Sequence, residues 1–200
     1  MKIPEPIRDF VDAFSGLPGI GPRQAIRLAF HIIEKGKNFN IKLSRAATSL
    51  VDLKPCAECF YVQAVDNNLC EICSDGKRNK KIIAVVEKPT DLLSIENTKK
   101  FEGVYFVIGD LRKTGILDTE QKLRLNALKA RIEKKLGGKA EEIIIAINPT
   151  SYGDLNAVVI AKELTPFAEK ITRLGRGIPT GGEIEFADEE TLTEAIKRRT

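Results

Sequence analysis

Hydrophobic and polar positions change their spacing once along the chain, and the first part has the spacing of helices. Phe10 and Phe14 are one helical turn apart, and the apolar residues of 25–32 also recur at helical spacing. Ser44 has the side chain of a helix N-cap and is expected to begin a third helix. The pattern therefore predicts three helices within residues 4–53.

The second part begins near Lys81 and alternates continuous apolar runs with helical segments. Strands that are covered on both faces read as such continuous apolar runs, and alternation of strands with helices favours a mostly parallel sheet. The predicted strands are Ile82–Val86, Val104–Ile108, Ile143–Ile147 and Ile171–Leu174, and the predicted helices are 90–97, 120–136 and 155–164.

Composition describes an ordinary globular chain. The 200 residues are 42% hydrophobic and 30% charged, a length that suits one or two domains. No apolar run reaches the roughly 18–20 residues that a membrane-spanning helix needs. The first residues contain no apolar signal core, so we expect a cytoplasmic protein that does not associate with membranes.

The excess of positive charge lies entirely in the first part. Residues 1–81 hold 13 Lys and Arg against 9 Asp and Glu, whereas residues 82–200 hold 19 of each. A basic half is compatible with binding to phosphate groups, although an excess of four charges alone is a modest signal.

All four cysteines lie in two Cys-x-x-Cys turns. Cys56 and Cys59 form the first pair, and Cys70 and Cys73 form the second, with ten residues between the pairs. Two such turns can complete a tetrahedral shell of four sulfurs around Zn²⁺, which predicts one structural zinc ion per chain and a closed site. Two disulfides, a redox pair and an iron–sulfur cluster are the alternatives.

Two further features are ambiguous in the sequence. The basic run Lys77–Lys81 is either a phosphate contact or a solvated linker. His31 is the only histidine and falls in the apolar stripe of the second predicted helix, so we interpret it as a packing residue.

A glycine-rich turn separates the first two predicted helices. Gly19 and Gly21 permit positive φ and close backbone approach, and Pro22 suits the first position of a helix. Such a turn presents amide groups to a phosphate, and Arg23 and Arg27 share one helical face beside it. The pattern resembles a helix-hairpin-helix, which binds DNA without reading its sequence. The alternative is a tight helical corner that only packs.

Two of the predicted strands end in a way that resembles a Toprim domain, the module of topoisomerases and primases. In that domain a Glu after the first strand and an Asp-x-Asp after a later strand hold Mg²⁺ for phosphoryl chemistry. Glu87 fills the first position, but Asn148 and Thr150 occupy the Asp-x-Asp positions. We therefore predict that no residue is catalytic. The alternative, a Mg²⁺-dependent nuclease or primase-like enzyme, would use an unorthodox site of Glu87, Asp91, Asp110 and Asp154.

The order of these parts resembles the RecR family of bacterial recombination mediators over nearly the whole chain. The closing segment 172–188, with its glycines, Ile178-Pro179 and acidic end, is also similar to that family's C-terminal motif. Segments 110–116 and 151–154 depart from the family's usual residues.

The resemblance implies a role in DNA repair and a set of partners. RecR-type proteins bind gapped, single-stranded or duplex DNA with RecO and RecF, help to load RecA on single-stranded gaps, and form ring-shaped dimers or tetramers. It also implies a distribution of sites over this chain. DNA contact is expected at Gly19, Gly21, Arg23 and Arg27, zinc at Cys56, Cys59, Cys70 and Cys73, and the RecO contact at Glu87, Asp91 and Asp154.

The expected organisation has four parts. A helix-hairpin-helix domain would cover residues 1–54 and a zinc finger 55–78, followed by an α/β Toprim domain over 79–175. A helical C-terminal segment, 176–200, would close or oligomerise the protein. Within it, Asp188–Glu190 are expected at the N-terminus of a helix, where negative charge is favourable.

Overall fold

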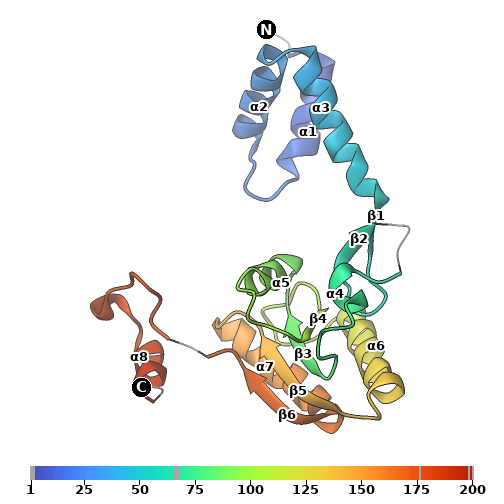
Figure 1. Cartoon of the computed structure of the whole chain (residues 1–200). Coiled ribbons are helices and arrows are strands. Elements are labelled where there is room, and N and C mark those ends of the chain that lie inside the picture. The colour runs from blue at the N-terminus through green and yellow to red at the C-terminus, as the bar shows by residue number, and fades with distance from the viewer. Residues whose placement is uncertain (1–2, 65–67, 176, 198, 200) are drawn as a thin grey trace. The chain divides into compact units, whose positions relative to one another are not determined.

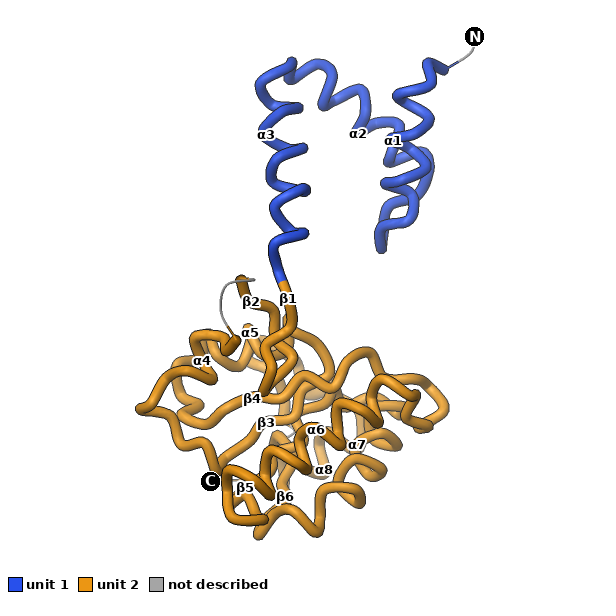
Figure 2. Tube along the Cα trace, turned by 90° about the vertical axis from the view of Figure 1, so that its right-hand side faces the viewer, with its two compact units in different colours: residues 1–53 blue, residues 54–200 orange. Residues whose placement is uncertain are grey.

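The computed structural model describes residues 3–64, 68–175, 177–197 and 199, and it divides into two compact units, residues 1–53 and 54–200 (Figures 1 and 2). The first unit contains α1 (Glu5–Ser15), α2 (Pro22–Glu34), α3 (Lys37–Thr48) and the 3₁₀ turn η1 (Ser49–Asp52), and β1 (Leu53–Pro55) begins where it ends. The second contains β2 (Val62–Ala64), α4 (Glu71–Ser74), β3 (Ile82–Val86), α5 (Pro89–Glu96), β4 (Val104–Val107), α6 (Thr119–Lys135), β5 (Ala140–Ala146), α7 (Ser151–Leu164), η2 (Thr165–Phe167), β6 (Ala168–Arg173), η3 (Ile184–Phe186) and α8 (Glu189–Lys197).

Three helices build the first unit, and their buried residues lie on α2. Ala25, Ala29 and Ile32 recur along one face of α2 and are the buried apolar side chains of this unit within its described residues.

Two expectations for the first unit were wrong. Ser44 lies inside α3, because Gly36 with φ 81° turns the chain and α3 already begins at Lys37. His31 is exposed, with its ring edge-on to Phe39 at a centroid distance of 6.5 Å.

A four-stranded parallel sheet forms the centre of the second unit, with strand order β4-β3-β5-β6. Val85 on β3 lies beside Phe106 on β4 and beside Ile145 on β5, so the two central strands are paired over their length. The expected parallel α/β sheet is therefore confirmed. The β3 strand spans the predicted Ile82–Val86, and the other three strands differ from the prediction at their ends.

Successive residues of β3 point to opposite faces of the sheet, and each face has its own cover. Ile83 and Val85 pack with residues of α6 and α7, such as Leu128 and Ile160. On the other face, Ala84 and Val86 pack with Leu92 of α5 and with apolar side chains of the cysteine-containing segment, Tyr61 and Ile72. That segment, which the structure describes over residues 55–64 and 68–75, is therefore one of the layers that cover the sheet (Figure 1).

The helices that follow the strands have side-chain caps. Asp118 accepts a hydrogen bond from the amide of Gln121 at 3.0 Å, and the Gln121 side chain accepts from the Asp118 amide, which is a capping box. Thr150 accepts from the amide of Gly153 at 3.2 Å, so α7 begins at Ser151, four residues before the predicted start. Asp154, which precedes the predicted helix 155–164, therefore lies in the first turn of α7. As expected, Asp188 caps α8 by accepting from the amide of Thr191 at 2.9 Å.

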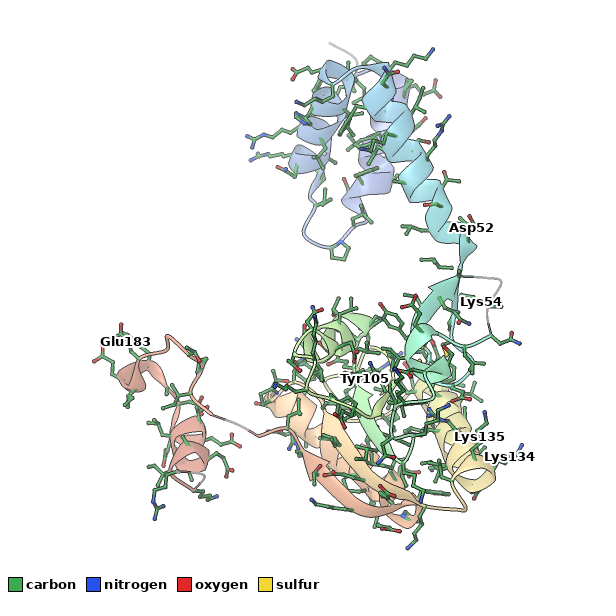
Figure 3. All side chains as sticks on the ribbon, viewed as in Figure 1. Asp52, Lys54, Tyr105, Lys134, Lys135 and Glu183 are labelled. Atoms are coloured by element: carbon green, nitrogen blue, oxygen red, sulfur yellow. The ribbon has the colours of Figure 1, made fainter. Side chains whose placement is uncertain are left out.

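A partly buried ionic network joins the segment after the cysteines to the sheet. The Arg78 guanidinium pairs with the carboxylate of Glu96 and donates to the carbonyl of Gly103 at 3.1 Å. The Tyr105 hydroxyl donates to the same carboxylate at 2.9 Å, from a side chain that lies within the second unit (Figure 3). Arg78, the arginine in the basic run 77–81, is thus engaged inside the unit and not offered to phosphate.

None of the helices in the described parts of the chain combines the length and the apolar character that crossing a membrane requires.

We expect the Arg78–Glu96 network to make stability depend on pH. The guanidinium of Arg78 holds the pKa of Glu96 below its ordinary value of 4.5, with a smaller contribution from the Tyr105 hydroxyl. A lowered folded-state pKa adds stability above pH 4.5 that is lost as pH falls through the folded value. The Glu96→Gln variant should already be destabilised at neutral pH. Urea unfolding curves should therefore show that its free energy of unfolding falls less on acidification than that of the wild type.

The matched control is Glu102→Gln, an exposed glutamate between α5 and β4, which should keep the wild-type pH dependence. If the free energy of unfolding fell equally with acid in the wild type and in Glu96→Gln, this network would not be a source of the pH dependence of stability.

Candidate DNA interface and metal centre

The turn between α1 and α2 leaves amide groups unpaired at a helix N-terminus. Gly19 has φ 78°, and the Ile20 amide closes the turn on the carbonyl of Leu17 at 3.1 Å. Gly21 is the N-cap of α2 in extended conformation, so of the two glycines only Gly19 needs a positive φ. Ala25 is the first residue of α2 whose amide donates a hydrogen bond to the turn, to the carbonyl of Gly21 at 2.9 Å. The amides of Arg23 and Gln24 have no acceptor within the described residues.

The side chains beside these amides are basic and accessible. Arg23 and Arg27 are exposed on the side of α2 opposite its buried face. Neither has an ion pair among the described residues of the chain. Free amides at a helix N-terminus attract a phosphate, and two unpaired guanidinium groups one turn apart can contact further phosphates.

The four cysteines converge on one buried point. Their sulfur atoms all lie within 4.8 Å of one another, the Sγ atoms of Cys59 and Cys70 are 3.5 Å apart, and all four thiols are free. Four sulfurs bound tetrahedrally at about 2.3 Å from zinc would be about 3.8 Å apart. The arrangement can therefore hold a metal ion, and the protein would supply all four of its ligands.

The electrostatics of this cluster also favour a cation. Hydrogen bonds from Cys59 and Cys73 lower the pKa of the Cys70 thiol to about 2, whereas the hydrogen bond to Cys70 raises the pKa of Cys59. One thiolate is stabilised at the expense of its neighbours, because buried sulfurs this close repel one another when all are ionised. A divalent metal ion would remove that repulsion.

The cysteine turn 56–59 is fixed to the sheet and to α6. The carbonyl of Cys59 accepts from the amide of Val107 at the end of β4, at 2.8 Å. Between the two cysteines, Glu58 forms a nearly buried ion pair with Arg131, with Nε and Oε2 3.3 Å apart, and a second one with Lys135 on the exposed end of α6 (Figure 3). Phe60 packs edge-on against Phe106 at 5.5 Å. The cysteine turn and the sheet are therefore one packed structure.

Glu87 directly follows β3 and is only 2% exposed. One carboxylate oxygen accepts from the amide of Leu111 at 3.1 Å, and the other has no hydrogen-bond partner in the described chain. Asp91 instead bonds to the amide of Lys88 at 3.0 Å in a capping box of α5. Asp154 is paired with Arg173.

The carboxylates do not gather into a metal site. Within the ranges that the structure describes, the four cysteines are the group of three or more metal-binding side chains close enough to share an ion, and Glu87, Asp91 and Asp154 form no such group. Asn148 and Thr150, after β5, use their backbone and hydroxyl groups to shape the start of α7.

Comparisons with known proteins agree with this arrangement. Family models match as RecR, helix-hairpin-helix over residues 7–50, as Toprim domain over 81–175, and as RecR, C-terminal over 177–200. Recombination protein RecR of Anaeromyxobacter sp. is 40% identical over 202 residues, which cover 100% of this chain and 98% of the relative. The chain belongs to the RecR family. Its recognition from sequence is thereby confirmed.

Further RecR relatives also match over nearly the whole of both chains. Recombination protein RecR of Herpetosiphon aurantiacus is 36% identical, covering 98% of this chain and 94% of that protein. The Dehalococcoides mccartyi protein of the same name is 38% identical, covering 96% of this chain and 93% of the relative. The chain is thus a RecR-type recombination protein with a Toprim domain.

Two groups of interacting residues in this RecR-type chain were not foreseen from its sequence. These are the pairs that Glu58 makes with α6 and the Arg78 network. The only sequence signal for the ion pairs of Glu58 was its position between two cysteines, and that position does not indicate which basic residue it contacts. The second group joins Arg78 to Glu96, 18 positions later at the end of α5. The basic run that contains Arg78 was expected to be either a phosphate contact or a solvated linker.

We expect Gly19 to be required for the conformation of the hairpin in this RecR-type chain. Alanine at φ 78° costs about 1 kcal/mol, so Gly19→Ala should lower the thermal unfolding temperature measured by circular dichroism. Gly16→Ala is the matched control, because Gly16 has φ −77° and space for a methyl group. It should be neutral or slightly stabilising. Equal unfolding temperatures for the two variants would contradict the requirement for glycine at position 19.

Proposed function

We propose that this chain is a non-catalytic, DNA-binding mediator of recombinational repair. The observation that carries the proposal is the hairpin before α2, where free amides lie beside the exposed, unpaired Arg23 and Arg27. These groups contact phosphate and not base edges, so binding would not depend on DNA sequence. Gly19 and Gly21 would let the backbone approach the phosphate closely.

We propose that the four cysteines hold one zinc ion per chain with a structural role. Four buried sulfur ligands leave no position for a reacting water, and soft thiolates select zinc among the common structural ions. The contacts of Glu58 and Cys59 with α6 and β4 support this role, because metal binding would fix the turn that covers the sheet.

The Toprim domain is proposed to serve as a scaffold and partner surface. Two of the three usual metal-binding anions are replaced by Asn148 and Thr150, which argues against the alternative of a Mg²⁺-dependent nuclease or primase-like enzyme. Following the family resemblance, we propose that the surface near Glu87, Asp91 and Asp154 contacts RecO. RecF would be a further partner, and RecA would be loaded by the pathway.

We further propose that residues 176–200 join copies of the chain into a ring-shaped dimer or tetramer. Ile184, Phe186 and Ile196 are 68%, 79% and 62% exposed, which is costly for apolar side chains unless a partner covers them. The proposed functional parts are a helix-hairpin-helix domain (1–54), a zinc finger (55–78), a Toprim domain (79–175) and this closing segment, in a cytoplasmic protein.

The test of DNA binding is fluorescence anisotropy on gapped duplex DNA over a range of salt concentrations. Arg23→Ala with Arg27→Ala should weaken binding about tenfold or more and reduce the slope of log K against log salt by about 1–2, since each lost phosphate contact releases about one counterion fewer. The control is Lys134→Ala with Lys139→Ala, which removes the same charge from exposed positions of the second unit. Equal losses in both double variants would show that net charge alone is responsible.

Zinc content is tested by elemental analysis of the purified chain. We expect one zinc ion per chain, a large loss of it in Cys70→Ser, and a lower unfolding temperature after metal removal. Iron in place of zinc, or a metal-free chain of full stability, would contradict the assignment.

A further inference from the structure

A basic surface lies at the amino-terminal edge of the parallel sheet, opposite the edge at which Glu87 lies. The loops that lead into β3 and β4, residues 75–81 and 97–103, meet at this edge, because the two strands are paired in parallel (Figure 1). Together the loops contain six basic side chains and two acidic ones. The sheet therefore has a basic edge that the contacts proposed above do not use.

Hydrogen bonds hold the two loops against each other. The Asn79 amide donates to the carbonyl of Glu102 at 3.0 Å, and the Arg78 guanidinium donates to the carbonyl of Gly103 at 3.1 Å. Arg78 also pairs with Glu96 at the end of α5. The remaining basic side chains of both loops therefore project from one hydrogen-bonded backbone.

Four lysines on these loops are exposed and have no ion pair among the described residues of the chain. We call them the lysine edge: Lys77, Lys80, Lys99 and Lys100. The other two basic side chains of the loops, Arg78 and Lys81, pair with carboxylates. Asp75 pairs with Arg78, so within the loops Glu102 alone offsets the four lysines. Four lysines against one glutamate leave an excess of three positive charges.

Local folding accounts for only part of this charge. Lys99 and Lys100 follow the end of α5, where a cation is favourable beside the last carbonyl groups of the helix. Lys77 and Lys80 lie on the loop after α4, and the four residues of α4 provide little dipole. Unpaired like charges repel one another across the two loops, so an anionic partner is the simplest explanation for the lysine edge.

The composition of the surface favours a nucleic-acid backbone over an acidic protein. Protein interfaces centre on apolar side chains and are depleted in lysine. None of the exposed large hydrophobic side chains in the described parts of the chain lies on the loops 75–81 and 97–103. The phosphates of a nucleic-acid strand require positive charges at intervals and no apolar pocket, which is what these loops offer.

We propose that the lysine edge is a second DNA contact of this chain, which binds the phosphate backbone at the amino-terminal edge of the Toprim sheet. The inference rests on the proposed DNA-binding function and adds a contact on the second unit to the hairpin contact on the first. Its lysines contact phosphates and not base edges, so this contact does not depend on DNA sequence. Two contacts on one chain raise its affinity for a DNA that both can reach, because the second binds at a high effective concentration.

Amine footprinting on the full chain locates the contact. The chain is acetylated with an N-hydroxysuccinimide ester, with and without gapped duplex DNA, and mass spectrometry gives the extent of acetylation at each lysine. DNA should lower acetylation of the lysine edge about threefold or more, because a lysine that contacts phosphate is shielded from the reagent. Four exposed lysines elsewhere in the second unit should react equally with and without DNA: Lys113, Lys122, Lys134 and Lys162.

Two outcomes of the footprint would overturn the proposal. The first is unchanged acetylation of the lysine edge at DNA concentrations that saturate the chain. The second is protection by polyglutamate at lower concentrations than by DNA, which would assign the surface to an acidic protein.

A pair of fourfold variants tests the contribution of the lysine edge to affinity. Changing its four lysines to glutamine should weaken DNA binding about tenfold or more and lower the slope of log K against log salt by about 2–3, since up to four phosphate contacts are lost. The matched control changes the four reference lysines of the footprint to glutamine and removes the same charge. Equal losses in the two variants would overturn the proposal. The footprint on the wild-type chain stands even if a fourfold variant folds poorly.

The hairpin variant separates this inference from the DNA-binding proposal. In Arg23→Ala with Arg27→Ala, the remaining binding should still depend on salt, and saturating DNA should still protect the lysine edge. Binding that is lost with the hairpin and unaffected by the lysine edge would overturn the inference and leave the proposed function intact. Binding that depends on the lysine edge alone would support the inference and overturn the hairpin contact.

Discussion

Burial of the parallel sheet on both faces is the constraint on which the second unit depends. All four strands run in one direction, so the residues that follow β3, β4 and β5 meet at one edge. Their side chains there are the buried Glu87, the exposed Asp110 and the uncharged Asn148. This is the edge at which the Toprim resemblance places a metal site, and here Asn148 and Thr150 reduce its negative charge. This is the physical basis for proposing a partner surface in place of catalysis.

The cysteine segment completes that sheet, and the two cannot be understood separately. Tyr61 and Ile72 cover one face, and the carbonyl of Cys59 bonds to the end of β4. A turn of this size buries too little apolar surface to order itself, so a metal ion is the expected source of its rigidity. Because Phe60 follows that turn and packs edge-on against Phe106 of β4, a bound metal ion would also fix this contact with the sheet.

Sequence reasoning was most successful where local pattern and burial coincide. The run Ile82–Val86 reads as a doubly covered strand and is one, and the two cysteine pairs are close together as their spacing required. Helix starts were less predictable: Gly36 and Thr150 begin helices earlier than the apolar spacing indicated, because a turn or a cap decides there. The pairing of Glu58 with Arg131 was not predictable, since a contact across 73 positions has no local signal.

We expect the Toprim edge, without the Asp-x-Asp carboxylates, to carry no phosphoryl chemistry on bound DNA. The most direct test is prolonged incubation of the chain with end-labelled gapped DNA, with Mg²⁺ or with EDTA, followed by a denaturing gel. The strands should stay intact in both conditions at protein concentrations that bind all of the DNA. Cleavage or extension that requires Mg²⁺ and disappears in Glu87→Gln would contradict this expectation and make the chain an enzyme.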